Sequence, residues 1–326
     1  MKKLSVLSLL IVVLASAILT GVVYAQDELI QIGVLQLVEH AALDAANSGF
    51  VAGLKDSGFE EGKNIEIDQQ NAQADQANLM TISDRFVKNK VDLILAIATP
   101  AAQAVASATT EIPILVTAVT DLVGARLVES NEVPGTNVSG TTDAAPIDKQ
   151  LALLMELFPE TKTLGIIYNS SEVNSEIQAK QVEEEATKLG LAVEKGTITS
   201  VNDIEQVASS LSSKVDAIYA PTDNTIASAM PNLAKVTEEK KIPTICGEPG
   251  MVKAGGLMTI GIDYYKLGYQ TGLMAARVLK GEAEPSTMPV ESLKDVDIVL
   301  NQDTADAIGY TFPESILEKA AIVYPE

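Results

Sequence analysis

Acidic side chains follow closely after several apolar stretches of this chain, at the positions where buried strands would end. Asp121, Glu172, Asp223, Glu248 and Asp263 are of this kind. Lysine and arginine are nearly absent from the same positions. A cleft that is lined by carboxylates without matching cations suits a ligand that carries an ammonium group. Recognition of such a group is the first chemistry that these residues indicate.

Hydroxyl, amide and imidazole groups accompany these acids, and hydroxyls or helix-starting amides can hold a carboxylate. Thr99 and Pro100 are typical of a helix start, with Thr99 as the cap and Pro100 at the first helical position. The alternative is that each polar residue is only a cap or turn residue, which is the better interpretation for Ser170 and Thr222. The polar residues expected at strand ends are His40, Thr99, Asp121, Ser170, Glu172, Asn174, Asp223, Asn224, Glu248 and Asp263.

The sequence lacks the motifs of common hydrolases and nucleotide-binding enzymes. It contains no GxSxG, no P-loop and no HExxH. One histidine, His40, and one cysteine, Cys246, are too few for a usual zinc site, and we expect neither a metal nor a cofactor. A pair of acids could hydrolyse glycosides, but carbohydrate clefts usually offer aromatic platforms, and this chain has no Trp and 4% aromatic residues. We expect a binding protein rather than an enzyme, with an acid-pair hydrolase as the alternative.

One sequence pattern occurs twice and indicates how these residues are positioned. Residues 91–100 read VDLILAIATP, and residues 215–224 read VDAIYAPTDN. Each copy is an apolar run that starts at Val-Asp and ends in a polar tip, and each leads through an alanine-rich stretch to an Ile-Pro pair. A repeat at this separation is too long for a solenoid and is typical of two βαβ lobes. The alternative is that buried parallel strands look alike because they share Val, Ile and Ala.

Expected strands and helices alternate along the chain, which predicts parallel sheets. The fold class is therefore α/β, with two Rossmann-like lobes whose parallel sheets are joined by a multi-strand hinge. We expect residues 30–143 and 262–285 in the first lobe and residues 144–261 and 290–326 in the second. The carboxyl ends of parallel strands face one crevice, so the polar tips would meet in a cleft that can close on a ligand.

The first 25 residues have the composition of a targeting segment. Lys2 and Lys3 precede a nearly unbroken apolar run, and Val23-Tyr24-Ala25 offers small residues for cleavage, so we expect a signal peptide at 1–25. The run has no cysteine for a lipoprotein anchor, and an uncleaved membrane anchor is the alternative. We expect an exported protein, either periplasmic or associated with the cell surface.

Charge and cysteine content narrow the partners further. A formal net charge of -21 over 326 residues argues against nucleic acid and against an anionic membrane surface as the main partner. A single cysteine in an exported chain forms no internal disulfide. We expect Cys246 to be a small buried residue of a strand over residues 244–247.

Three short motifs together resemble those of a known family. They are ATPAA at residues 98–102, NSSEVNS at residues 169–175 and PTDN at residues 221–224. With the two-lobe organisation, they resemble the ABC transporter substrate-binding proteins of the tryptophan/tyrosine-type family, over roughly residues 30–308. The resemblance implies a type I periplasmic-binding-protein fold that holds an aromatic amino acid between its lobes and delivers it to an ABC transporter permease.

The resemblance also suggests roles for individual residues. Thr99, the amides that follow it and Ser170 would take the ligand's carboxylate, and Asp223 or Glu172 would take its ammonium group. The apolar part of the ligand would lie near Tyr168, Tyr264 or His40. A receptor of the same fold for a sugar, a nucleoside or a signalling molecule is the alternative. The residues carried over from the family are Thr99, Pro100, Asp121, Ser170, Glu172, Asn174, Asp223, Asn224, Asp263 and Tyr264.

Overall fold

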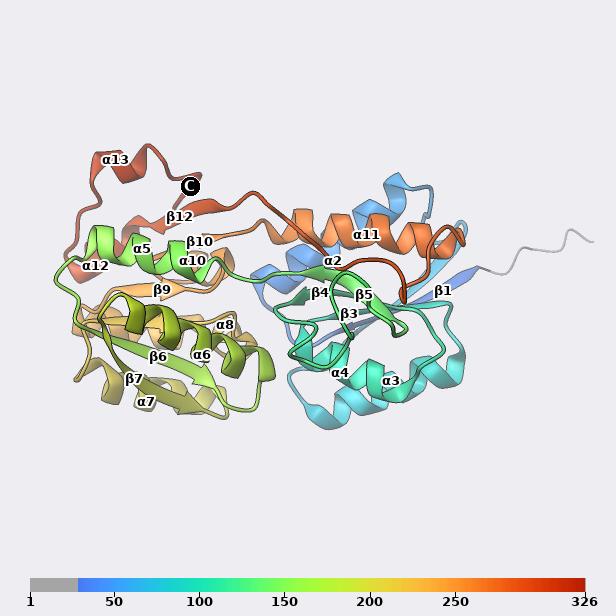
Figure 1. The fold of residues 1–326 in the computed structure, drawn as a ribbon, viewed down its shortest axis with the longest axis horizontal. Helices are drawn as coiled ribbons and strands as arrows, with labels where there is room; N and C mark the ends of the chain where they lie inside the picture. The colour runs from blue at the N-terminus through green and yellow to red at the C-terminus, as the bar shows by residue number, and fades with distance from the viewer. Residues whose placement is uncertain (1–28, 326) are drawn as a thin grey trace, which may run out of the picture.

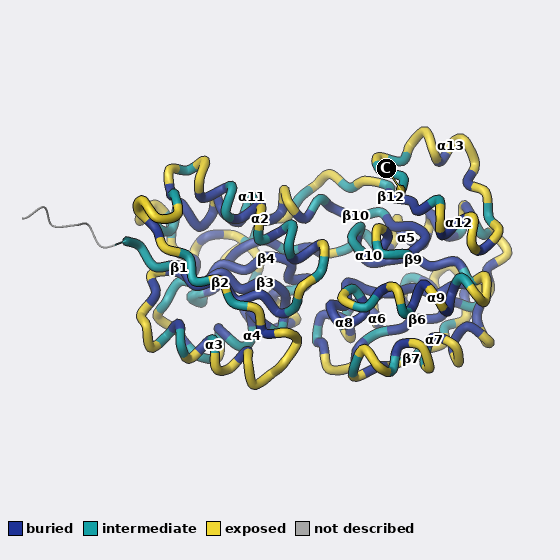
Figure 2. Tube along the Cα trace, turned by 180° about the vertical axis from the view of Figure 1, so that it is seen from behind, coloured by how far each residue is buried: buried dark blue, intermediate teal, exposed yellow. Residues whose placement is uncertain are grey.

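The computed structural model describes residues 29–325, so the signal peptide expected at 1–25 lies outside the described residues. Two lobes lie side by side, and each has a central sheet with helices on both faces (Figure 1). The central strands are buried throughout, while exposed residues concentrate on the outer helices and loops (Figure 2). Within the described residues, no helix is both long enough and apolar enough to cross a membrane.

All the pairings of the first sheet are parallel, as the sequence pattern predicts. In spatial order, its strands are β11 (Glu291–Ser292), β5 (Val138–Thr142), β4 (Ile114–Val119), β3 (Leu93–Ile97), β1 (Ile30–Gln36) and β2 (Ile65–Asn71). The helices that pack on this sheet are α2 (Ala41–Asp56), α3 (Gln76–Asn89), α4 (Thr99–Ala108) and α11 (Tyr264–Leu279).

The second sheet repeats this plan with one exception. Its strands, in spatial order, are β13 (Ile322–Tyr324), β12 (Asp297–Asn301), β10 (Met258–Gly261), β9 (Thr244–Cys246), β8 (Ala217–Ala220), β6 (Thr163–Asn169) and β7 (Ala192–Ile198). The expectation of wholly parallel sheets is wrong at β12, which runs antiparallel to β10. The reason is that Asp297 pairs with Gly261, so the chain enters the lobe through β12 where it left through β10.

The helices of the second lobe are shorter and more interrupted than the sequence suggests. Residues 224–240 form two helices, α8 and α9, because Pro231 lacks the N–H and the steric freedom that a continuous helix would need. A short helix at Pro249 was not expected. The elements are α5 (Ile147–Leu157), α6 (Val173–Lys188), η1 (Val201–Asp203), α7 (Ile204–Ser212), α8 (Asn224–Ser228), α9 (Met230–Lys240), α10 (Pro249–Lys253), α12 (Gln302–Ile308) and α13 (Glu314–Leu317).

The two copies of the repeated pattern form β3 and β8, which occupy equivalent central places in the two sheets. The aspartate at the start of each copy has the same local role. Asp92 Oδ2 accepts from the backbone N–H of Gln31 at 2.7 Å, and Asp216 Oδ2 accepts from that of Thr163 at 2.8 Å. Each aspartate therefore fixes the start of the neighbouring strand, β1 or β6, which explains why both copies begin with Val-Asp.

Helices α2 and α11 lie against each other at backbone contact, side by side in Figure 1. A Cβ atom on Gly49 would lie 2.0 Å from the carbonyl oxygen of Tyr265, and one on Gly268 would lie 1.8 Å from that of Ala46. Glycine at these positions is what permits so close an approach. The contact fastens α11 to the first lobe directly after the chain returns from the second.

Three chain segments connect the lobes, at residues 143–146, 262–263 and 293–296. We expected residues 290–326 in the second lobe, but Glu291 and Ser292 pair with Thr141 and Thr142 in the first sheet. The third crossing therefore lies after β11, because that short strand completes the edge of the first sheet.

Candidate functional site

The lobes meet through direct side-chain contacts, so the cleft between them is closed. His40 Nε2 lies 3.3 Å from Asn224 Oδ1, and the hydroxyl oxygens of Thr120 and Thr222 are 3.1 Å apart. Between the lobes remains a cavity of about 10 Å³, room for roughly one water molecule. The residues that line this cleft cavity are His40, Leu43, Ala118, Asp143, Thr222, Asp223, Asn224, Ala227, Glu248 and Tyr264.

Asp223 is fully buried at the tip of β8, where it is the N-cap of α8. Its Oδ1 accepts from the N–H of Ile226 at 2.9 Å, and its Oδ2 accepts from the N–H of Asn169 at 2.6 Å. Burial, followed by repulsion from Glu172, raises the pKa of Asp223 to about 7. The carboxylate therefore holds two strand tips together while it lines the cleft.

Glu172 is almost fully buried and forms hydrogen bonds with the residues that follow Asp223 at the start of α8. Its Oε2 accepts from the side-chain amide of Asn224 at 2.6 Å, and its Oε1 accepts from the N–H and hydroxyl of Thr225 at 2.9 and 2.8 Å. Asn174 donates to the carbonyl oxygen of Thr222 at 2.9 Å, but its own buried Oδ1 has no partner. The crowding expected around residues 169–175 and 221–224 is thus present, as a network that fixes Asn224.

Glu248, a strand-end acid expected at the cleft, reaches the cavity from the start of α10. Its carboxylate accepts from the N–H groups of Gly250 and Met251, the latter at 2.8 Å. Burial raises the pKa of Glu248 to about 7. No lysine or arginine lines the cleft cavity, and the described residues contain no group of acids, histidine and cysteine placed to hold a metal ion.

Asp143 is a buried cavity residue that the sequence reasoning missed. It stands at the first crossing between the lobes, and its Oδ2 accepts from the hydroxyl of Tyr264, the first residue of α11, at 2.5 Å. Burial raises the pKa of Asp143, and it outweighs the opposing effect of the hydrogen bond from Tyr264. The signal that could have found it is an acid directly after Thr141 and Thr142, at the boundary expected between the lobes at residues 143 and 144.

His40 reaches the cavity from the first lobe, at the N-cap position of α2. Its ring makes no capping hydrogen bond and instead faces Asn224 across the cleft. Burial lowers the pKa of His40, and the hydrogen bond with Asn224 opposes this only in part. The imidazole is therefore neutral near pH 7 and adds no cation to the acid-lined cavity.

Seven of the candidate residues do not line the cleft cavity: Glu172 and Asn174, which support the tip described above, and Thr99, Pro100, Asp121, Ser170 and Asp263. Thr99 is buried but is the first residue of α4 rather than its cap, because the chain turns at Ala98 with φ of 82°. The expectation of a Thr99 cap with Pro100 at the first helical position is therefore wrong by one residue. Pro100 faces a surface groove between α3 and α4, where Gln76 and Met80 also lie.

The other three make local contacts outside the cavity. Asp121 is half-buried and accepts from the N–H of Gly124 at 2.8 Å. Ser170 is exposed, and its backbone N–H donates to Ile198 at the end of β7. Asp263 caps α11 by accepting from the N–H of Lys266 at 3.1 Å. These contacts are those of cap and turn residues.

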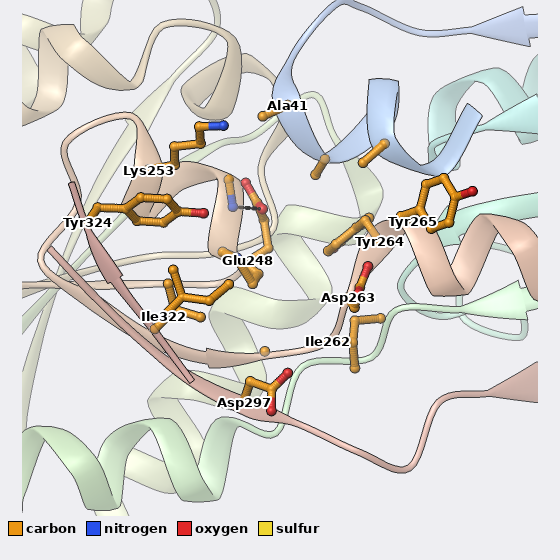
Figure 3. Close-up of a pocket in the computed structure, with 16 residues that line it drawn as sticks. Ala41, Glu248, Lys253, Ile262, Asp263, Tyr264, Tyr265, Asp297, Ile322 and Tyr324 are labelled. Atoms are coloured by element: carbon orange, nitrogen blue, oxygen red, sulfur yellow. Dashed lines mark hydrogen bonds between the residues drawn. The ribbon is translucent and has the colours of Figure 1, made fainter. Parts of the chain in front are cut away.

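A second pocket, of about 260 Å³, adjoins the cleft cavity at the hinge and shares Glu248 and Tyr264 with it (Figure 3). Its walls come from both lobes: the start of α2 faces α10, the second crossing, strand β12 and the edge strand β13. The lining is mostly apolar, with Ile262, Ile322 and the ring of Tyr324 among it. Apolar space therefore lies directly beside the buried acids.

Comparison with known proteins places this geometry in a family. The sequence profile of the family described as ABC transporter substrate binding protein matches residues 31–324. A protein named tyrosine-binding protein, from Clostridioides difficile (strain R20291), is 50% identical over 278 residues, which are 85% of this chain and 80% of that protein.

Two solved structures are informative about conformation. An ABC domain in complex with L-Trp from Streptococcus pneumoniae is 40% identical, covers 91% of this chain and 100% of its own, and superposes with a TM-score of 0.87. The ligand-free, open structure of a substrate-binding protein with adhesive properties from Clostridium difficile is 48% identical over the same shares, but its TM-score is only 0.70. The lobe arrangement is thus closer to that of the L-Trp complex than to the open form.

The fold, the cleft between the lobes and the sequence comparisons all indicate the same family. The fold is the type I periplasmic-binding-protein fold, and the leucine-binding protein of Thermotoga maritima superposes on it with a TM-score of 0.59 at 13% identity. The chain belongs to the family of ABC transporter substrate-binding proteins.

Proposed function

We propose that this protein is the extracytoplasmic receptor of an ABC importer and that it binds an aromatic amino acid, tyrosine, tryptophan or phenylalanine, between its lobes. The observation that carries the proposal is the closed cavity between the lobes, which is lined by Asp143, Asp223 and Glu248 and by no lysine or arginine. An ammonium group would supply the missing positive charge.

The relatives support the choice of an aromatic side chain. One relative at 50% identity is named for tyrosine, and a structural neighbour at 40% identity holds L-Trp. The apolar pocket that shares Glu248 and Tyr264 with the cleft offers space beside the acids for a ring. His40, Asp223, Asn224, Glu248 and Tyr264 are the site residues that this proposal retains at the ligand.

Binding requires the lobes to open, because about 10 Å³ is far too small for an amino acid. A ligand that contacts both lobes would favour the closed arrangement, and it would do so only through its preference for that state. The closed receptor would then deliver the ligand to a membrane permease. The signal-like composition of residues 1–25 supports export to the periplasm or the cell surface.

Thermal unfolding in the presence of candidate ligands tests the proposal. We expect L-tyrosine, L-tryptophan or L-phenylalanine to raise the Tm in a concentration-dependent way, because a ligand that binds only the folded state stabilises it. Sugars and nucleosides serve as matched comparisons. Stabilisation by ribosides or sugars alone would replace this function with that of a sugar or nucleoside receptor. Turnover of a glycoside would instead favour an acid-pair hydrolase.

A further inference from the structure

The buried acids at the cleft differ in how many of their oxygen atoms already have partners. Both oxygens of Asp223 accept from backbone N–H groups, of Ile226 and Asn169. Both oxygens of Glu172 accept from residues of the α8 start, and neither belongs to the cavity lining. The carboxylate of Glu248 accepts from two N–H groups at the start of α10. These three acids are occupied with holding strand tips and short helices.

Asp143 is different because one of its oxygens is left without a partner. Its Oδ2 accepts from the Tyr264 hydroxyl, whereas its Oδ1 is buried and makes no hydrogen bond. The neighbouring Thr120 hydroxyl lies 3.1 Å from that of Thr222 across the cleft. The side chain is 5% exposed and lines the cleft cavity. A buried acceptor that lacks a donor is costly in free energy, so this atom indicates a group that arrives with the ligand.

We propose that Asp143 is the principal anchor for the ammonium group of the ligand, in place of Asp223 or Glu172. The inference rests on the proposed function, since it names the residue that reads the amino group of the bound amino acid. Asp143 Oδ1 would accept a charge-assisted hydrogen bond, which is about twice as strong as a neutral one. Asp223 and Glu172 then hold the start of α8 in place through their hydrogen bonds.

The position of Asp143 also ties recognition to the hinge. Asp143 belongs to the first crossing and Tyr264 directly follows the second, so their 2.5 Å hydrogen bond joins the first crossing to the start of α11. Tyr264 is a positioning residue here, since its hydroxyl fixes the carboxylate whose other oxygen faces the cavity. An ammonium group bound to Asp143 would thus lie where the lobes pivot.

A comparison of ligands with and without the amino group tests this assignment. Binding of L-tyrosine and of 3-(4-hydroxyphenyl)propionate, which is tyrosine without its ammonium group, is measured by calorimetry for the wild type and for Asp143→Asn. We expect the wild type to prefer L-tyrosine by about 10- to 100-fold, the range for a hydrogen bond between charged partners. Asp143→Asn should lose most of that preference. If the wild type binds L-tryptophan more tightly than L-tyrosine, the comparison is made with L-tryptophan and 3-indolepropionate, which is tryptophan without its ammonium group.

Asp121→Asn is the matched control, because it makes the same chemical change at an acid outside the cavity, and it should keep the wild-type preference. The assignment is overturned if Asp143→Asn still discriminates by the wild-type factor, or if it loses affinity equally for both ligands, as a merely structural role would predict. Tyr264→Phe should retain discrimination but reduce it, since the carboxylate remains while its orientation is no longer fixed. If the wild type binds no amino acid, the proposed function itself fails, and this assignment fails with it.

Discussion

Two buried carboxylates of the second lobe, those of Asp223 and Glu248, serve the backbone and the cleft at once. Asp223 and Glu248 end a strand, cap the short helix that follows and present their remaining surface to the cavity. Such caps satisfy N–H groups that a helix start otherwise leaves without partners. This arrangement has an electrostatic cost in free energy, because closure of the lobes removes the two carboxylates from water and brings no cation to them.

This cost makes the ligand-free protein sensitive to pH. The pKa of Glu248 is raised from 4.5 to about 7, so the stabilisation linked to its protonated form is complete below pH 4.5 and is lost as the pH rises through 7. We expect the Tm of the ligand-free protein to fall between pH 5 and pH 8, and the loss from this group to be on the order of 3 kcal/mol at most. Differential scanning calorimetry across this range measures the change.

Glu248→Gln should flatten this pH dependence, because the glutamine side chain does not titrate. Glu39→Gln removes the same charge at an exposed position and should leave the slope as it is in the wild type. A slope that is equally steep in Glu248→Gln would show that the buried acid is not its source.

The sequence predicted the cleft residues that follow a strand and begin a helix, because that pattern has a local signature. His40, Asp223, Asn224 and Glu248 were found in this way, whereas Tyr264 came from the family resemblance. Asp143 follows a strand too, but it begins no helix, and its burial depends on contacts with Tyr264, 121 residues away. Ser170 has the right local pattern, yet the tip turns it toward β7, and only the packed structure shows this.

At the scale of elements, the repeated pattern predicted the most. The central strands, their parallel pairing and the helices between them follow from buried runs that alternate with amphipathic segments. The misses have physical reasons: β11 has two residues and β13 three, too few for a periodic pattern, and α10 has five. The direction of β12 depends on where the chain re-enters the second lobe, which local sequence does not encode.

The contact between α2 and α11 should be the least tolerant of added volume. In Gly268→Ala, the new methyl group would overlap the carbonyl oxygen of Ala46, a backbone atom that cannot rotate away. We expect a loss of about 2–3 kcal/mol in the free energy of unfolding, at the upper end for an overpacked core. Urea denaturation measures it. Leu273→Ala, at a half-exposed position of the same helix, should cost less than half as much.

At the scale of the whole molecule, ligand and closure should be linked. The opposed side chains of His40 and Asn224 meet only when the lobes are together. We expect the ligand-free protein at pH 8 to populate an open arrangement, because Asp223 and Glu248, whose pKa values in the closed cleft are about 7, are then charged with no cation beside them, and we expect an aromatic amino acid to restore the closed one. Small-angle X-ray scattering should show a smaller radius of gyration on addition of the ligand.

Asp143→Asn provides the comparison, because it removes one of the charges whose burial opposes closure. Its ligand-free radius of gyration at pH 8 should be smaller than that of the wild type, and the ligand should change it less. An identical radius with and without saturating ligand in the wild type would contradict closure as the response to binding.

The glycine contact between α2 and α11 has a consequence for how ligand preference can change. His40 precedes α2 and Tyr264 is the first residue of α11. Because these two helices are in backbone contact, the two side chains move together as part of one rigid body. The opposing tips stand on α8 and α10, two separate helices of five residues each. A change of ligand preference is therefore easiest at the starts of α8 and α10, because residues at one of these helices can be substituted without displacing the other.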